Sequence, residues 1–361
     1  MALFVSCVAS VATSMAQDPD WLNMSYTLHS EIQAVDNDGF AVFPMNAPVR
    51  MRGVILNRPV DMLDGRPGAN PYMGGQWQIY VQAVEDDFGG TACWMGQNIG
   101  KITGTHPQGS YTDQEWLAEI DRLSHDPVSG RAFRIGDLIE IRARAPGMAY
   151  RGKSNINEQH SNDPAADYDL VLLQADYGLP APAALTLADL KDVNDDFIFD
   201  PARLVGPEHY QGSLVRIDGV TFVDPEPWAP DANLTVTDGS GRTLTVLLGR
   251  GGGFEIYPAP AGTFDVVGIL DQEDLDANNG YKDDYRLWVM NYNGNGTVIE
   301  GVGCQGDLTG DGRVTISDLA ELLGHYGATG ASYADGDFDR DGDVDLSDLA
   351  ELLGVYGTSC W

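Results

Sequence analysis

Alternation of apolar and polar residues with a period of two recurs through the first half of the chain. Residues 77–82 read Trp-Gln-Ile-Tyr-Val-Gln, which is the pattern of a half-buried β-strand. Segments of the same kind predict four further strands, at 49–57, 91–95, 138–144 and 170–174. Between the third and fourth strands, Thr112 and Glu115 form a capping-box pattern and are followed by apolar residues on one helical face, so a helix is predicted over 112–123.

A second group of strands begins near Gly212. The pattern predicts strands at 214–223, 233–238, 243–248, 263–270 and 285–292, with the glycine-rich stretch 249–253 after the third strand in place of a helix. Residues 181–211 are rich in Pro, Ala and Asp, and we expect a linker with one short helix there. The chain then divides into units at 17–180 and 212–300 and a C-terminal segment at 304–361.

Five strands with a helix after the third is the order of an OB-fold, a Greek-key barrel. Both units resemble the OB-like domains of exported bacterial proteins, and the resemblance covers most of residues 45–292. The stretches that carry it are Gly53-Val54, 76–82, 136–139, 212–220 and 264–269. The expected fold is therefore mainly β, with two tandem OB-like barrels.

The C-terminal segment contains an internal repeat. Residues 306–324 recur 30 residues later as 336–354, and each copy continues to a Tyr-Gly pair. Duplication this close predicts two copies of one structural unit. Each copy begins with an aspartate-rich stretch that has glycine at its sixth position, Gly312 and Gly342, followed by an apolar helix pattern.

Twelve-residue loops of this kind bind calcium in an EF-hand-like manner, through oxygens at positions 1, 3, 5, 7, 9 and 12, with glycine at 6 for the sharp turn. The first loop offers fewer carboxylates, which predicts weaker binding, although repulsion among the five aspartate side chains that the second loop offers as ligands would reverse that order. The expected ligands are Asp307, Thr309, Asp311, the Arg313 carbonyl, Thr315 and Asp318 in the first loop, and Asp337, Asp339, Asp341, the Asp343 carbonyl, Asp345 and Asp348 in the second.

These loops, the aspartate at position 12 and the run Asp-Leu-Ala-Glu-Leu-Leu-Gly that follows resemble the type I dockerin module. The resemblance covers residues 306–357 and implies two calcium-loop and helix units packed antiparallel, which dock onto a cohesin-like protein. The family's docking positions fall on Ile316, Ser317, Leu346 and Ser347. This chain departs from the pattern at Gly324 and Gly354, which shorten the predicted helices, and in lacking the basic residues often present there.

A third candidate for calcium lies before the last predicted strand. Asp274, Asp276 and Asn278 have the alternating spacing of a calcium loop, but Gly280 comes one residue too late for the pattern. The alternative is a solvated acidic turn. Two calcium sites are thus expected, with a third as a hypothesis.

Composition changes the functional picture. The chain has 54 Asp and Glu against 21 Lys and Arg, a net charge of −33, so its field repels phosphate backbones and argues against nucleic acid as a partner. Residues 1–16 are apolar, uncharged and end in Ser-Met-Ala, which is typical of a secretory signal. No other stretch has the roughly 20 apolar residues needed to span a bilayer.

The cysteines fit an exported protein. Cys304 and Cys360 bracket the C-terminal segment, and we expect them to pair in an oxidising compartment. Cys7 would leave with the signal segment, so Cys93 is left over and is interpreted as a small buried core residue, with an intermolecular bond as the alternative.

Known catalytic motifs are absent from the sequence, which has no His-Glu-x-x-His, Gly-x-Ser-x-Gly or phosphate-binding loop. The leading hypothesis is a secreted, non-catalytic protein that assembles at the cell surface, as a matrix or filament, through its calcium module and a cohesin-like partner or copies of itself. The alternatives are a carbohydrate- or nucleic-acid-binding module tethered by the dockerin-like segment, and a hydrolase whose carboxylate pair the sequence does not single out.

Overall fold

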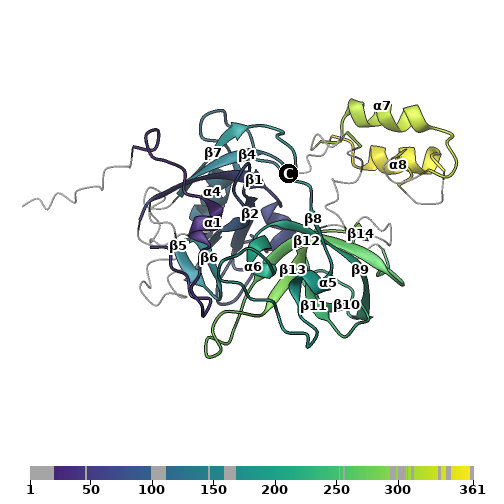
Figure 1. Ribbon diagram of the computed structural model, residues 1–361. Coiled ribbons are helices and arrows are strands. Elements are labelled where there is room, and N and C mark those ends of the chain that lie inside the picture. Colours follow the sequence, from purple (N-terminus) through teal and green to yellow (C-terminus); the bar gives the residue numbers. More distant parts are fainter. Residues whose placement is uncertain are drawn as a thin grey trace, which may run out of the picture.

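The computed structural model describes residues 20–44, 47–98, 111–144, 147–157, 168–251, 253–254, 257–292, 298–299, 306, 308–309, 313–331, 335–338 and 343–357. The fold is mainly β (Figure 1). Two seven-stranded sheets make up the body, and two short helices form the C-terminal segment.

The first sheet follows the predicted strands closely and carries the predicted helix. Its elements are β1 (Val49–Ile55), β2 (Gln76–Gln82), β3 (Gly90–Gly96), β4 (Leu138–Ala143), β5 (Gly147–Tyr150), β6 (Lys153–Asn157) and β7 (Tyr168–Gln174), with the helices α1 (His29–Ile32), α2 (Pro59–Met62) and α4 (Asp113–Ser124). Thr112 caps α4 through the predicted capping box, because its hydroxyl accepts from the Glu115 N–H while the Glu115 carboxylate accepts from the Thr112 N–H.

The strands of the first sheet lie in the order β5-β6-β3-β2-β1-β4-β7. All neighbours pair antiparallel except β3 and β6, which are parallel. Alternate residues of β1, β2 and β4 meet Trp116 and Leu123 of α4 in one core, so the period-two pattern marks the buried face as expected. Cys93 lies in this core with a free thiol, and burial raises the pKa of that thiol.

The hairpin of β5 and β6 was not predicted from the sequence. We expected 170–174 to be the fifth strand of the unit, but β7 pairs with β4 at one edge, and β6 takes the place beside β3. Within the described residues, the pairings of this sheet do not close it into a barrel. The hairpin escapes the pattern because β6 reads Lys-Ser-Asn-Ile-Asn and is buried along its whole length in spite of its polar residues.

The second sheet contains β8 (Ala183–Leu185), β9 (Leu214–Asp224), β10 (Asn233–Thr237), β11 (Thr243–Leu248), β12 (Phe264–Gln272), β13 (Tyr285–Val289) and β14 (Val298–Ile299). Five of these strands form a closed mixed barrel in the order β9-β10-β11-β13-β12, and β12 pairs back onto β9. The strands β11 and β13 are parallel, and the other pairs of the barrel are antiparallel. Closure leaves the five strands without free edges.

The predicted linker belongs to the second unit. Residues 181–211 contain β8, α5 (Leu187–Leu190) and α6 (Pro207–Tyr210), and β8 pairs parallel to β9. Leu185, Leu187 and Leu190 lie in the core of the barrel. The Pro- and Ala-rich composition suggested a spacer, but three leucines buried on folding stabilise this segment against the barrel wall.

A buried charge cluster joins the two sheets. Asp271 of β12 is 1% exposed and accepts from Lys153 Nζ of β6 at 2.6 Å and from the Tyr80 hydroxyl of β2 at 2.5 Å. From its own sheet, Arg286 Nε and Trp288 Nε1 donate to the other oxygen at 2.9 and 3.1 Å. Burial alone would raise the pKa of Asp271, but the charges of Lys153 and Arg286 hold that pKa below its usual range.

Apolar contacts and backbone contacts complete this junction. Leu56, Met62 and Ala92 of the first unit pack with Ile269 of the second. The Gly90 N–H donates to the Gln211 carbonyl at 2.9 Å, and the neighbouring Gly212 has φ +77°. A Cβ on Gly90 would lie 2.1 Å from the Gly212 oxygen, so only glycine permits this approach.

Replacing Lys153 by methionine removes the nearest cation from Asp271 and leaves a buried carboxylate short of one partner. We expect Lys153→Met to lower the free energy of unfolding by about 3–5 kcal/mol, measured by urea denaturation. The matched control is Lys282→Met, because Lys282 pairs with Asp38 at the surface and such pairs are worth about 1 kcal/mol or less. Equal losses in the two variants would contradict a structural role for the buried cluster.

Candidate metal centre

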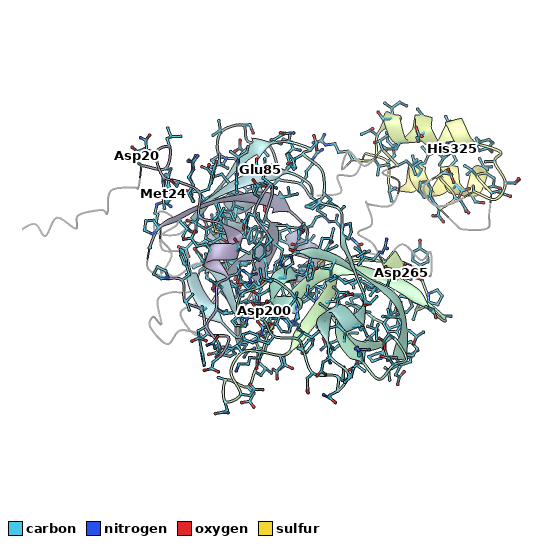
Figure 2. All side chains as sticks on the ribbon, in the orientation of Figure 1. Asp20, Met24, Glu85, Asp200, Asp265 and His325 are labelled. Atoms are coloured by element: carbon cyan, nitrogen blue, oxygen red, sulfur yellow. The ribbon has the colours of Figure 1, made fainter. Side chains whose placement is uncertain are left out.

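The C-terminal segment folds as two equivalent units. The helices α7 (Ile316–His325) and α8 (Leu346–Gly354) lie side by side (Figure 1), and His325 at the end of α7 is labelled in Figure 2. Each unit is hydrogen-bonded to the other through a valine at loop position 8. The Val344 carbonyl accepts from the Gly327 N–H, in the turn after α7, and the Val314 carbonyl accepts from the Gly357 N–H, in the turn after α8, both at 2.8 Å. The two valines pack with Leu322, Leu352 and Phe338 in a small shared core.

In the second loop, the structure brings the side chains of positions 7, 9 and 12 together. Asp343, Asp345 and Asp348 each have a carboxylate oxygen within 4.8 Å of the others. Asp348 is fully buried, and its two oxygens accept from the Phe338 N–H at 2.6 Å and from the Asp345 N–H at 2.7 Å. Asp337 at position 1 is also buried.

In the first loop, positions 3, 9 and 12 converge in the same way. Asp318 is fully buried and accepts from the N–H and hydroxyl of Thr309 at 2.9 and 2.8 Å, and from the N–H of Thr315 at 2.7 Å. Burial raises the pKa of Asp318, but these hydrogen bonds outweigh it and the net effect lowers that pKa. The carboxylate is therefore ionised at neutral pH, as a calcium ligand must be. Arg313, expected to offer its carbonyl, is exposed.

The position-12 aspartates serve the helices as well as the loops. Thr315 and Asp345 cap α7 and α8, and the third residue of each helix, Asp318 or Asp348, returns a bond to the cap N–H. The same aspartate thus occupies the last position of the loop and completes the capping box of the helix. Gly324 lies inside α7 and Gly354 ends α8, so α7 continues one residue beyond its glycine.

Several predicted residues lie outside the described part of the chain. They are the ligands Asp307, Asp311, Asp339 and Asp341, the proposed Cys304–Cys360 pair, and the signal segment 1–16. Those predictions stay as predictions.

The donor set fits a hard cation. The side chains that converge in both loops offer oxygen only, as Ca²⁺ requires, and the second loop gathers three carboxylates in one place. Residues 306–357 carry 12 acids against two bases, so the bound ion would relieve strong repulsion. The described residues thus provide a cluster that could hold a metal ion in the second loop.

The predicted docking positions are all exposed. Ile316 and Leu346 are 65% and 67% exposed, and Ser317 and Ser347 beside them also face solvent. Further along the helices, exposed large apolar side chains again come as repeat-related pairs, Leu323 with Leu353 and Tyr326 with Tyr356. We name these six apolar side chains the paired apolar face.

A second acidic cluster lies in the connection between β12 and β13, but its members differ from the predicted ones. Asp274, which is fully buried, meets Asp283 and Asp284 with carboxylate oxygens within 4.8 Å. Asp276 and Asn278 are exposed and bond each other instead, because the Asn278 N–H donates to Asp276 at 3.0 Å. The predicted calcium loop therefore shares Asp274 with this cluster, whereas Asp276 and Asn278 lie outside it.

The charges of this cluster repel one another. Burial and the adjacent Asp274 carboxylate raise the pKa of Asp283 to about 6. A divalent cation between these carboxylates would remove that repulsion. The sequence signal for Asp283 and Asp284 is weak, since an acidic pair nine residues after Asp274 becomes its neighbour only when the β12–β13 connection folds back.

Comparisons of the chain with protein-family models, with curated proteins and with solved structures give no match. The likeness to the dockerin module therefore rests on the loop residues themselves. Among the described residues, no helix combines the length and the apolarity that crossing a membrane requires.

Replacing Asp348 by asparagine tests the second loop. Asp348→Asn removes a buried carboxylate from the ligand cluster, and we expect the number of calcium ions bound per chain in calorimetry to fall by one. Calcium at about a thousandfold above Kd stabilises a folded site by about 4 kcal/mol, so the shift of Tm on adding calcium should also shrink. The control is Glu321→Gln, which removes one charge from an exposed position of the same helix pair; equal calcium binding by both variants would contradict the assignment.

The acidic cluster of the β12–β13 connection makes a separate prediction. Asp283→Asn should abolish a third calcium site, whereas Asp276→Asn should leave it unchanged, because only Asp283 lies in the cluster. Titration of both variants with calcium, on the Asp348→Asn background to simplify the count, distinguishes them. Loss of the site in Asp276→Asn alone would favour the calcium-loop interpretation instead.

Proposed function

We propose that this chain is an exported, calcium-stabilised, non-catalytic assembly protein. In this proposal, the two loop-helix units form a dockerin-like module that docks to a protein partner, and the β-body is the part that becomes assembled. The observation that carries the proposal is the duplicated loop and helix: each copy buries its position-12 aspartate and exposes the same three apolar side chains. Calcium holds the loops, and the loops orient the helices that present the paired apolar face.

We also assign both β-units to the OB-like class. Read from β12, the closed barrel has the order β12-β9-β10-β11-β13 with β11 and β13 parallel, and the first sheet contains the corresponding order β4-β1-β2-β3-β6, with β3 and β6 parallel. The helix α4 stands between the third and fourth strands of the first unit. This shared order supports two copies of one architecture, of which the first carries extra edge strands.

The paired apolar face supports docking rather than core packing. Large apolar side chains that are 46–67% exposed and repeat in both loop-helix units are typical of a surface that a partner covers. The helices contribute Leu322 and Leu352 to the core that they share. Each helix therefore has one apolar side that is buried in this core and a second apolar side that is exposed to solvent. The partner would be a cohesin-like protein or another copy of this chain.

The rival function, a carbohydrate- or nucleic-acid-binding module, has less support from the aromatic residues. Trp77, Tyr80 and Trp94 are at most 9% exposed and belong to the interior of the first unit and its junction. Trp228 packs against the core of the second barrel, and Trp288 against the junction. The first three rings are therefore not available for stacking against sugars or bases, and the last two expose only part of their surface.

Sedimentation velocity with calcium and with a chelator tests the assembly proposal. We expect the full chain to form larger species in calcium and to return to monomer in EGTA. The variant Ile316→Ser with Leu346→Ser should stay monomeric in calcium while still binding the ion, because both positions are exposed and contribute no described ligand.

The matched control changes exposed apolar residues of the β-body, Leu204→Ser with Val205→Ser, which are 74% and 57% exposed. This control should assemble like the unchanged chain. A chain that is monomeric in calcium, yet is retained on immobilised polysaccharide, would favour the binding-module function. Turnover of an ester or glycosidic substrate that a single carboxylate change abolishes would refute the non-catalytic proposal.

A further inference from the structure

Residues 203–212, which we name the connecting segment, contain α6 and lead into β9 of the second unit. They also contact the first unit at several points. These contacts are Arg203 Nη1 to the Ser30 carbonyl at 3.1 Å, Gln211 Nε2 to the Gly152 carbonyl at 3.2 Å, the Gly90 N–H to the Gln211 carbonyl at 2.9 Å, and the stacked rings of His209 and Phe88 with centroids 4.6 Å apart. A displacement of the connecting segment would therefore loosen the first unit from the second.

Glu208 lies in the middle of this segment, in α6, and is fully buried. Its Oε1 accepts from the Tyr285 hydroxyl of β13 at 2.5 Å. Its Oε2 is also buried and has no hydrogen-bond partner among the residues that the structure describes. An ionised carboxylate in the interior needs a paired cation or several donors. With one donor for two oxygens, the position favours the neutral carboxylic acid.

The cation beside Glu208 is directed mainly to other acceptors. Arg203 is 2% exposed, and its Nε lies 3.6 Å from Glu208 Oε2, which is beyond hydrogen-bonding range. That Nε donates instead to the Glu208 main-chain carbonyl at 2.9 Å, while Nη1 donates to Ser30 and the guanidinium lies over the Phe88 ring at 5.2 Å. The guanidinium therefore joins the two units while its attraction to the buried carboxyl group is only partly used.

The titratable groups around Glu208 act in opposite directions. Burial raises the pKa of Glu208 to about 7, the Tyr285 hydroxyl and the Arg203 charge lower it, and the Asp200 carboxylate raises it. Burial also lowers the pKa of Arg203, against the charges of Glu208 and of Asp87 in the first unit. An acid whose pKa is higher in the folded protein than its usual 4.5 stabilises the fold at low pH. That stabilisation is lost as the pH rises from about 4.5 through about 7.

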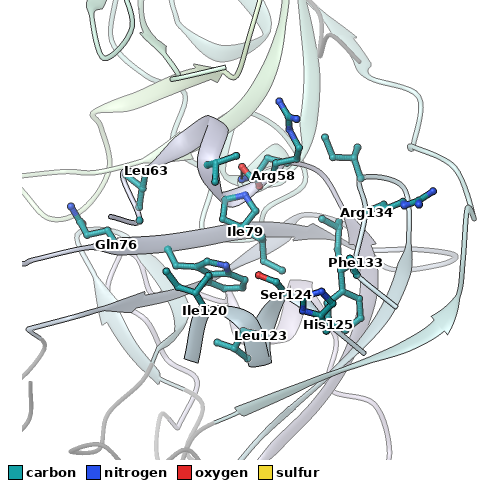
Figure 3. A pocket seen from close by; sticks show the side chains of 18 residues that line it. Arg58, Leu63, Gln76, Ile79, Ile120, Leu123, Ser124, His125, Phe133 and Arg134 are labelled. Carbon is teal, nitrogen blue, oxygen red and sulfur yellow. Dashed lines mark hydrogen bonds between the residues drawn. The ribbon is translucent and has the colours of Figure 1, made fainter. Parts of the chain in front are cut away.

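An occupant of the largest apolar hollow described in the first unit would not reach this carboxyl group. The pocket of about 210 Å³ in Figure 3 is lined by residues between 55 and 135, and none of them belongs to the connecting segment. Glu208 therefore responds to the pH of the solution and not to a molecule in that pocket.

We infer that Glu208 is a pH-sensitive latch between the two β-units, closed while its carboxyl group is protonated and open once that group ionises. In the closed state, Arg203 stays on the Ser30 carbonyl and the Phe88 ring. Ionisation places a full negative charge 3.6 Å from the guanidinium, which is drawn away from the first unit to pair with it. The latch belongs to the β-body and is independent of the calcium module and of the proposed assembly function.

Urea denaturation of the full chain in calcium tests the latch, with Glu208→Gln as the variant, because glutamine keeps an acceptor for Tyr285 and does not ionise. The unfolding equilibrium constant of the unchanged chain, divided by that of the variant, should rise on the order of a hundredfold between about pH 4.5 and about pH 8. In the control Glu31→Gln, which changes an exposed glutamate, the corresponding ratio should stay constant. A constant ratio for Glu208→Gln as well would overturn the inference.

Hydrogen exchange shows whether the junction is the part that opens. After correction for the intrinsic rate, the Gly90 N–H should exchange faster above pH 7 than below it, relative to the Val246 N–H inside the barrel. Glu208→Gln should abolish this pH response. A response that persists in the variant would assign it to another group, such as His209, and would refute the latch.

A second variant keeps the test decisive if Glu208→Gln does not fold. Tyr285→Phe removes the described donor to the Glu208 carboxyl group, and because that hydrogen bond lowers the pKa of Glu208, the midpoint of the Gly90 exchange response should move to higher pH. The control Tyr177→Phe makes the same change at an exposed tyrosine and should leave the midpoint where it is. A midpoint that stays constant or falls in Tyr285→Phe would contradict the proposal.

Discussion

Every carboxylate that this acidic chain buries must be compensated by positive charge or by donors, and the rest of the fold depends on how that is done. In the β-body, Asp271 is compensated by Lys153 and Arg286, so the protein supplies its own cations. In the C-terminal units, Asp318 and Asp348 accept hydrogen bonds from backbone N–H groups of their loops, and Asp348 also lies beside the carboxylates of Asp343 and Asp345. Under the proposed function, calcium would supply the positive charge for the carboxylate cluster of the second loop.

The β-body and the C-terminal helix pair are therefore stabilised by different interactions. The junction around Asp271 unites two β-units through ion pairs, apolar contacts and a backbone hydrogen bond, so the units should unfold together. Among the described residues of the helix pair, five buried apolar side chains form the core and six partly buried ones pack against it, so this core is much smaller than those of the β-units. In the proposed function, calcium binding would order the exposed helix surface while the β-body stays folded.

The sequence predicted local features well and long-range partners poorly. The ten period-two strands and the capped helix at 113–124 appear where the pattern placed them, because alternation and capping are local signals. The hairpin of β5 and β6 was missed because its buried strand is polar. Strand β8 was missed because the Pro- and Ala-rich composition of residues 181–211 indicated a linker, in spite of three leucines that become buried. The calcium-loop spacing pointed to Asp274 but not to Asp283, because only the folding of the β12–β13 connection brings Asp283 close to Asp274. The paired pattern of the C-terminal loops was predictable because duplication repeats it within the chain.

The Gly90–Gly212 contact has an evolutionary consequence. Since two main chains meet there with no side chain between them, substitution cannot gradually reshape the angle between the β-units. Descendants of this protein are free to change the surface, the loops and even the terminal helices, but they must keep both glycines or lose the arrangement altogether. A glycine that begins the third strand of one unit, matched by a glycine just before the first strand of the next, is accordingly a marker by which the same two-unit body can be searched for in distant sequences.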